Sequence, residues 1–123
     1  MIPTPDTEPP ATPLSPRVFA ILLALAGGPA HGYQIMKAVQ RQSDGAIRID
    51  AGSLYRTIAQ LVDEELLRET DRRPKPESDD SRRRYYELTG RGRERLAAEA
   101  TRLSSALAVA RRLNVIGHAR GTR

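Results

Sequence analysis

Residues 50–71 read DAGSLYRTIAQLVDEELLRETD, and within this stretch the periodicity of a helix gives way to that of a strand. Leu54, Ile58 and Leu61 recur at the spacing of one helical face. Residues 66–71 then alternate in character, as the residues of a half-buried strand do. The stretch therefore predicts a helix that begins near its first residue and is followed by a strand.

A second strand is predicted at residues 83–88, which also alternate in character. The residues between the two strands include Pro74, Pro76 and the polar run Glu77–Ser81, a composition typical of a loop. The two strands therefore predict a hairpin whose long, charged tip spans residues 72–82.

Two helices are predicted before this region. Ser15 is a good N-cap and Pro16 suits the first helical position, so the first helix starts there and ends at residues 27–29, which read Gly-Gly-Pro. The second helix is expected at about residues 31–40, and residues 46–49 are expected to form a very short strand.

A long fourth helix is predicted at residues 89–116, with Thr89 as its cap. Its apolar residues follow the spacing of a short coiled-coil seam: Leu96, Ala100, Leu103, Leu107 and Ala110. Asn114 takes the next position, where it either pairs with its copy in a second chain or marks the end of the seam. Because the seam has no obvious partner within its own chain, we expect a homodimer.

The order helix, helix, helix, strand, strand, helix predicts a mainly α fold of the α+β type. It is that of a winged helix-turn-helix with a two-stranded wing and a C-terminal dimerisation helix. We expect a disordered arm at residues 1–14, which hold five prolines, and a basic tail at residues 117–123. Between them we expect residues 15–88 to form the winged helix-turn-helix domain and residues 89–116 the dimerisation helix.

Composition narrows the classes of function. The chain has 123 residues, enough for one domain, and its 20 Lys+Arg against 15 Asp+Glu give a net charge of +5. Such an excess points to nucleic acid first and to an acidic membrane second. The absence of Cys excludes thiol nucleophiles and Cys-based metal sites. With two His and no catalytic constellation, we expect no enzyme, cofactor or metal, and with no signal peptide or membrane span we expect a cytoplasmic protein.

The third helix carries a polar face that suits DNA. This face consists of Ser53, Arg56, Thr57 and Gln60. Arg56 matches guanine or a phosphate, and Gln60 matches adenine. Ser53 is expected to bind a phosphate with the help of free N–H groups at the helix start. The alternative is an ordinary polar outer face.

Cations flank the loop of the hairpin: Arg72, Arg73, Lys75, Arg82, Arg83 and Arg84. We expect them to contact phosphates, while Glu77, Asp79 and Asp80 at the tip stay in solvent. The alternative is a loop that is merely solvated.

The start of the second helix is another candidate contact. Tyr33 and Gln34 lie where helix-turn-helix proteins often touch the DNA backbone, although Tyr33 also suits a partly buried core position. We expect His31 to cap or pack rather than to bind a metal or act as a base.

Three segments resemble the PadR family of bacterial transcription regulators: residues 31–35 (HGYQI), residues 52–56 (GSLYR) with Leu61, and residues 84–89 (RYYELT) with Gly92. The resemblance runs from Leu14 to about Leu107. It implies a homodimer that binds a palindromic operator, commonly as a repressor, with helix four packed on the partner subunit and assisted by helix one. It also places four residues at or beside the DNA surface: Tyr33, Ser53, Tyr55 and Arg56.

The sequence departs from the family in two ways. Glu65 stands where the family usually has Gly before the wing, which bears on the angle of the wing. The region after the wing is also short, with a single C-terminal helix, as in the smaller subgroup of the family. The chain has no Trp, so the binding of flat aromatic drugs known for some members is not implied. The sequence leaves open whether a small-molecule effector binds between the subunits beside the seam or whether there is none. The main rival function is a winged helix that binds other proteins and no specific DNA.

Overall fold

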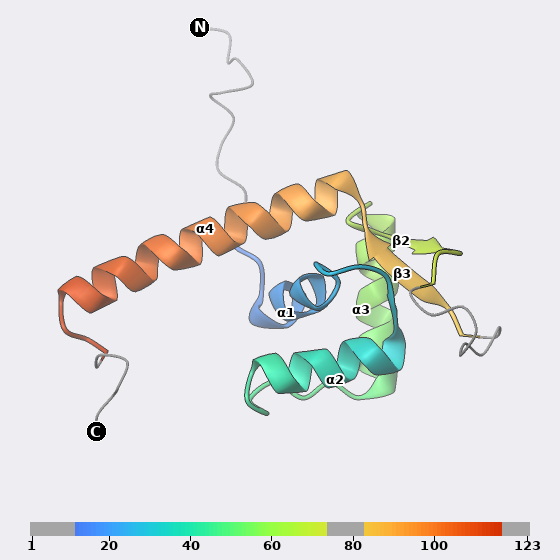
Figure 1. Cartoon of the computed structure of the whole chain (residues 1–123), viewed down its shortest axis with the longest axis horizontal. Helices are drawn as coiled ribbons and strands as arrows, with labels where there is room; N and C mark the ends of the chain where they lie inside the picture. Colours follow the sequence, from blue (N-terminus) through green and yellow to red (C-terminus); the bar gives the residue numbers. More distant parts are fainter. Residues whose placement is uncertain (1–11, 74–82, 117–123) are drawn as a thin grey trace, which may run out of the picture.

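The computed structural model describes residues 12–73 and 83–116 (Figure 1). Within them the chain forms four helices and three short strands in the following order: α1 (Pro16–Ala24), β1 (Ala30–His31), α2 (Gly32–Gln42), α3 (Ala51–Asp63), β2 (Leu67–Thr70), β3 (Tyr85–Leu88) and α4 (Gly90–Arg112). The predicted tail, residues 1–11 of the predicted arm and part of the hairpin tip with Lys75 and Arg82 lie outside the described residues.

Each helix begins at a residue whose side chain accepts a hydrogen bond from the backbone of the first turn. Ser15 caps α1 by accepting from the N–H of Val18, and Thr89 caps α4 by accepting from the N–H of Gly92. These caps confirm the predicted starts of the first and fourth helices. The first helix ends earlier than predicted, at Ala24, because residues 25–28 tighten into i→i+3 hydrogen bonds.

Three helices end with a non-glycine residue in the left-handed conformation. The φ angles are 55° at Asp44 after α2, 65° at Glu65 after α3 and 59° at Asn114 after α4. After α3, the N–H of Leu66 donates to the carbonyl of Leu61, which completes a Schellman motif. The turn before the wing therefore has the left-handed geometry that glycine favours, although Glu65 occupies it.

The strands form one antiparallel sheet in the order β1-β3-β2. Leu67 pairs with Leu88 at one end of the hairpin, and Thr70 pairs with Tyr85 at the other. The sheet differs from the predictions in two ways. Beside the two-stranded wing the sheet has a third strand, β1, which was not predicted. The strand predicted at residues 46–49 is absent, because Ile49 packs into the core from irregular backbone.

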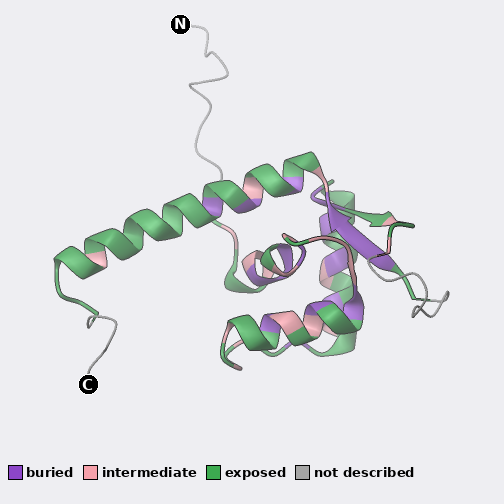
Figure 2. Cartoon of the chain, viewed as in Figure 1, coloured by how far each residue is buried: buried purple, intermediate pink, exposed green. Residues whose placement is uncertain are grey.

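The core lies between the first three helices and the sheet (Figure 2). Its fully buried side chains come from all of these elements: Ile21, Leu22, Leu25, Ile35, Val39, Leu54, Ile58, Leu61 and Leu67. Helix α4 joins this core through Leu96, and Gly92 lets its first turn approach the backbone of Leu66, where any Cβ would overlap the carbonyl oxygen. The arrangement is the winged helix that the order of elements predicts.

Candidate nucleic-acid interface

The start of α3 is already occupied by protein groups. The Asp50 carboxylate accepts from the N–H of Ser53 at 2.7 Å, and the Ser53 hydroxyl accepts from Nη1 of Arg17 at 2.7 Å. The N–H of Ser53 is therefore already bonded within the fold, while phosphate binding at Ser53 stays a prediction. The cation that reaches this end of α3 is Arg17, from the first turn of α1.

The outer face of α3 presents one arginine and two partly engaged polar side chains. Arg56 is exposed. Thr57 is half-buried, and its hydroxyl donates to the carbonyl of Ser53. Gln60 is exposed, and its amide donates to the Glu64 carboxylate at 3.2 Å. Arg56 is consequently the side chain of this face that is best placed to reach a base edge.

The start of α2 lies against α3 through a glycine. A Cβ on Gly32 would overlap the hydroxyl end of the Tyr55 side chain, so glycine leaves room for this tyrosine against the start of α2. Tyr33 is 58% exposed with the Lys37 ammonium 5.6 Å from its ring centroid, and Tyr55 is 46% exposed. Gln34 has a structural role as well, because its side-chain oxygen accepts from the N–H of His31 in a capping box.

The wing strands are joined by a buried carboxylate. Glu87, in β3, lies 2.7 Å from Nε of Arg68 and 3.5 Å from Nε of Arg72. Burial of the carboxylate between two guanidinium groups holds β2 and β3 in register. Arg72 is therefore exposed but partly occupied by this pairing.

The remaining described wing arginines differ in exposure. Arg73 is half-buried with its guanidinium over the Tyr85 ring, whereas Arg83 and Arg84 are exposed at the start of β3. Arg84 lies near Tyr86, whose pKa is raised by burial, although its hydrogen bond with Arg84 works in the opposite direction. Arg84 is also paired, since its Nε lies 3.9 Å from the Glu69 carboxylate, and Arg72, Arg83 and Arg84 are thus exposed wing cations that each have a partner within the fold.

A polar pocket of about 490 Å³ lies between the start of α2, α3 and the start of β3. We call it the polar pocket, and its lining consists of His31, Gly32, Tyr33, Tyr55, Arg83 and Arg84. It gathers residues from all three segments that resemble the PadR family, and its guanidinium and phenol groups are hydrogen-bond donors suited to phosphate. Of the predicted contacts, Tyr33, Tyr55, Arg83 and Arg84 therefore meet at one place. The other described ones lie outside this pocket: Gln34, Ser53, Arg56, Thr57, Gln60, Arg72 and Arg73.

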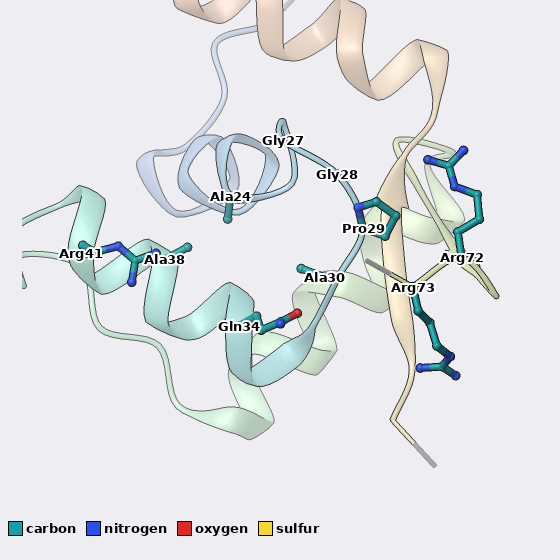
Figure 3. A pocket seen from close by; sticks show the side chains of 10 residues that line it. All are labelled: Ala24, Gly27, Gly28, Pro29, Ala30, Gln34, Ala38, Arg41, Arg72 and Arg73. Atoms are coloured by element: carbon teal, nitrogen blue, oxygen red, sulfur yellow. The ribbon is translucent and has the colours of Figure 1, made fainter. Parts of the chain in front are cut away.

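A second basic pocket lies on another side of α2 (Figure 3). Its volume is about 520 Å³, and its cations are Arg41, Arg72 and Arg73. Figure 3 shows that the three arginine side chains point in different directions and do not converge. This pocket therefore lacks a focused anion site.

The far half of α4 extends beyond the rest of the fold (Figures 1 and 2). Of the predicted seam, Leu96 is 7% exposed and belongs to the core of its own chain. Ala100, Leu103 and Leu107 are exposed, and Ala110 is half-buried. Within the described residues, no helix is both long and apolar enough to span a membrane.

An apolar groove of about 340 Å³ separates α1 from α4. Phe19 and Leu23 line it from α1, and Leu103 lines it from α4. At its edge Glu99 accepts two hydrogen bonds from Arg102, which lower the pKa of the carboxyl; burial opposes this, and the N–H of Leu14 adds to it. We call this feature the α1–α4 groove.

The model of the family described as "Transcriptional regulator PadR-like family" matches residues 21–98, which are more than half of the chain. The chain belongs to the PadR-like family. Membership places it among transcriptional regulators rather than enzymes. Within the described residues, no three His, Asp or Glu side chains are grouped so as to hold a metal ion.

Solved structures share this PadR-like fold. A PadR-like transcriptional regulator from Bacillus cereus aligns with a TM-score of 0.65 at 20% identity, over 79% of this chain and 89% of that one. A transcriptional regulator from Clostridium thermocellum gives 0.60 at 22%, over 77% and 86%. PadR from Bacillus subtilis, solved in complex with operator DNA, gives 0.52 at 23%, over 66% and 44%. These likenesses establish the winged-helix fold.

A sequence relative is a 37.1 kDa protein in transposon TN4556 of Streptomyces fradiae, 40% identical over 80 residues. The match covers 65% of this PadR-like chain and 21% of that protein. The chain thus corresponds to about a fifth of the relative's length.

Two features of this PadR-like chain were missed by the sequence interpretation. Arg17 reaches Ser53 across 36 positions, and Arg83 reaches His31 across 52 positions. Neither pairing leaves a periodic signal, because each depends on how separate elements pack. The one signal in the sequence for the Arg17 contact was a positive charge next to Pro16, at the start of a helix.

Proposed function

We propose that the chain is a homodimeric transcriptional repressor of the cytoplasm that reads a palindromic operator. Each subunit inserts α3 into the major groove and sets its wing on the neighbouring backbone. The domain at residues 15–88 binds DNA, and the helix that follows it joins the two subunits.

The observation that carries this proposal is the convergence of Tyr33, Tyr55, Arg83 and Arg84 on the polar pocket. These side chains come from the start of α2, from α3 and from the base of the wing, the elements that a winged helix turns toward DNA. Their phenol and guanidinium groups donate hydrogen bonds, as binding to phosphate requires. The proposal also draws support from the winged-helix likeness to the PadR solved with operator DNA.

Base recognition falls to the outer face of α3. Arg56 is the principal reader in this proposal, with Gln60 in a secondary role because its amide has to leave Glu64 first. Ser53 and Thr57 act close to the backbone, and Arg17 supplies a phosphate contact at the start of the helix. Arg72, Arg73, Lys75 and Arg82 add to the positive charge of the wing.

Dimerisation is supported by apolar residues that the single chain leaves exposed. Leu113 is 65% exposed and Val115 is 71% exposed at the end of α4, beyond Leu103 and Leu107. The α1–α4 groove offers a matching apolar surface. In the proposed dimer the seam consists of Ala100, Leu103, Leu107 and Ala110, with Leu96 at its edge, and packing of these residues removes apolar area from water.

Footprinting on the DNA upstream of the chain's own gene tests the proposal. A dimer protects two half-sites related by an inverted repeat, with centres about 10 base pairs or a multiple of that apart. A reporter driven by the same promoter is expected to fall in expression when the chain is present. Protection of one asymmetric site contradicts the palindrome, and a rise in reporter expression contradicts repression.

The rival function is a protein-interaction module that uses α4 and binds no specific DNA. The exposed apolar end of α4 is the observation in its favour. It predicts no salt-dependent binding to duplex DNA, and on that point the two functions separate.

A further inference from the structure

The imidazole of His31 lies where α2 meets the wing. The side chain is 5% exposed, and the residue both caps α2 and pairs with Tyr85 across β1 and β3. Its ring meets the Tyr85 ring edge to face, with centroids 5.2 Å apart and an angle of 84° between the planes. Packing therefore holds the imidazole in one orientation.

Each nitrogen of this ring faces a donor. The N–H of Gln34 donates to Nδ1 at 3.3 Å, and Nη1 of Arg83 lies 2.6 Å from Nε2. A guanidinium only donates, and a neutral imidazole has a single nitrogen lone pair. The two contacts therefore belong to different tautomers, and the shorter one, with Arg83, is made by the tautomer whose lone pair lies on Nε2.

Arg83 is also held at its backbone. Nη2 of Arg73 donates to the carbonyl oxygen of Arg83 at 3.2 Å, while the Arg73 guanidinium lies 4.5 Å from the centroid of Tyr85. The Arg83 guanidinium has five N–H donors, so a contact with His31 leaves the others available. Backbone and side chain are thus both positioned at the polar pocket.

We propose that His31 is a positioning residue for DNA binding: it holds the guanidinium of Arg83 at the polar pocket, where that guanidinium binds a phosphate of the DNA backbone. The inference rests on the proposed function. Holding the long arginine side chain in advance reduces the conformational entropy lost on binding. It also gives a reason for a histidine here, since Asn, Asp, Ser or Thr would cap α2 equally well without reaching Arg83.

Two substitutions separate positioning from capping. Asn offers an oxygen near the place of Nδ1, so His31→Asn keeps the cap of α2 and loses the contact with Arg83. Gln offers an oxygen near the place of Nε2, so His31→Gln retains a partner for Arg83 and gives up the cap. We expect His31→Asn to weaken binding to the upstream duplex about tenfold and His31→Gln to bind more tightly than His31→Asn.

A double-mutant cycle with Arg83→Ala identifies the residue through which His31 acts. Arg83→Ala alone is expected to weaken binding and to reduce the salt slope by about 1. In the Arg83→Ala background, His31→Asn is expected to have no further effect. Fluorescence anisotropy gives the affinities, and thermal melts followed by circular dichroism show that each variant is folded at the temperature of the titration.

The outcomes are distinct. Loss of affinity in His31→Asn that disappears in the Arg83→Ala background supports the inference. Unchanged affinity in His31→Asn, equal loss in both backgrounds, or tighter binding by His31→Asn than by His31→Gln overturns it. If the unsubstituted chain itself shows no salt-dependent binding to the upstream duplex, the proposed function fails, and this inference fails with it.

Discussion

The polar pocket and the α1–α4 groove are both open surfaces on one small chain, and they differ in chemistry. The polar pocket is lined by two arginines, two tyrosines and a histidine. The α1–α4 groove is lined mainly by apolar side chains, together with Gln42, Ser43 and the Glu99–Arg102 pair. Donor-rich surfaces suit phosphate, whereas apolar surfaces suit another protein surface. The contrast supports the proposal that DNA binds at the first and a second copy of the chain at the second.

The largest expected effect comes from disrupting the proposed dimer interface on α4. Leu103→Glu with Leu107→Glu places two charges on the seam of α4 and is expected to yield a monomer by light scattering. Affinity for the palindrome should fall by about 10²–10⁴, because the two half-sites are no longer linked. The matched control, Thr101→Glu with Ser105→Glu, places two charges on another face of the same helix. If the monomeric variant bound the palindrome as tightly as the unsubstituted chain, the proposal that a dimer binds the operator would be contradicted.

The wing provides the next largest effect. Replacing Arg82, Arg83 and Arg84 by Ala is expected to flatten the dependence of log affinity on log salt by about 2.7, if each contacts one phosphate. The control removes three other arginines at sites on α4: Arg95, Arg111 and Arg112. A slope that is the same in both triple variants would show that only net charge matters.

Substitution of Arg56 distinguishes recognition of a base from binding of a phosphate at the proposed DNA-binding surface. Arg56→Ala is expected to lower the affinity for the operator by about 1–3 kcal/mol and to relax the preference at one base position. Titrations against the operator and against single-base variants of it measure both effects. Equal weakening on every sequence would assign Arg56 to a phosphate instead.

Substitution of Glu65 tests the turn between α3 and β2. Glu65→Gly removes the strain of a left-handed non-glycine residue and is expected to stabilise the fold by about 0.5–1 kcal/mol in urea denaturation. The adjacent Glu64 has φ of −83°, so Glu64→Gly is expected to destabilise, since glycine only adds freedom to the unfolded chain there. Destabilisation by both substitutions would contradict the assigned strain.

The smallest effect concerns Glu99 at the edge of the α1–α4 groove. Its hydrogen bonds with Arg102 lower the pKa of the folded-state carboxyl, so this contribution to stability is present above the unfolded pKa of about 4.3 and is lost as the pH falls through the folded value. Thermal melts of Glu99→Gln are therefore expected to show a weaker loss of stability in acid. The exposed Glu94→Gln serves as the control, and an identical acid profile for all three proteins would refute this linkage.

Sequence was sufficient where the signal was local. The caps Ser15 and Thr89 each depend on one residue and the turn that follows it, so the sequence predicted these helix starts correctly. Strand β1 was missed because two residues carry no periodicity and pair only once β3 is in place. The strand predicted at residues 46–49 was wrong: Ile47 and Ile49 alternate with polar residues as in a strand, but the backbone there is irregular.

The candidate site divides in the same way. The family-like segments pointed to Tyr33 and Tyr55, and the cations of the hairpin pointed to Arg84; the fold brings all three to one pocket. The Asp50 carboxylate at the N–H of Ser53 and the contact between His31 and Arg83 were not foreseen. Such pairings depend on side-chain directions and on elements distant in the chain, which spacing within one segment does not encode.

The most direct test of the central claim is a fluorescence-anisotropy titration of the purified chain onto its own upstream DNA, beside a scrambled duplex, at about 50 and 200 mM salt. The account predicts tight binding to the upstream duplex that weakens by orders of magnitude with salt, and much weaker binding to the scrambled one. Absence of binding to either duplex at low salt would contradict it and favour the protein-interaction module.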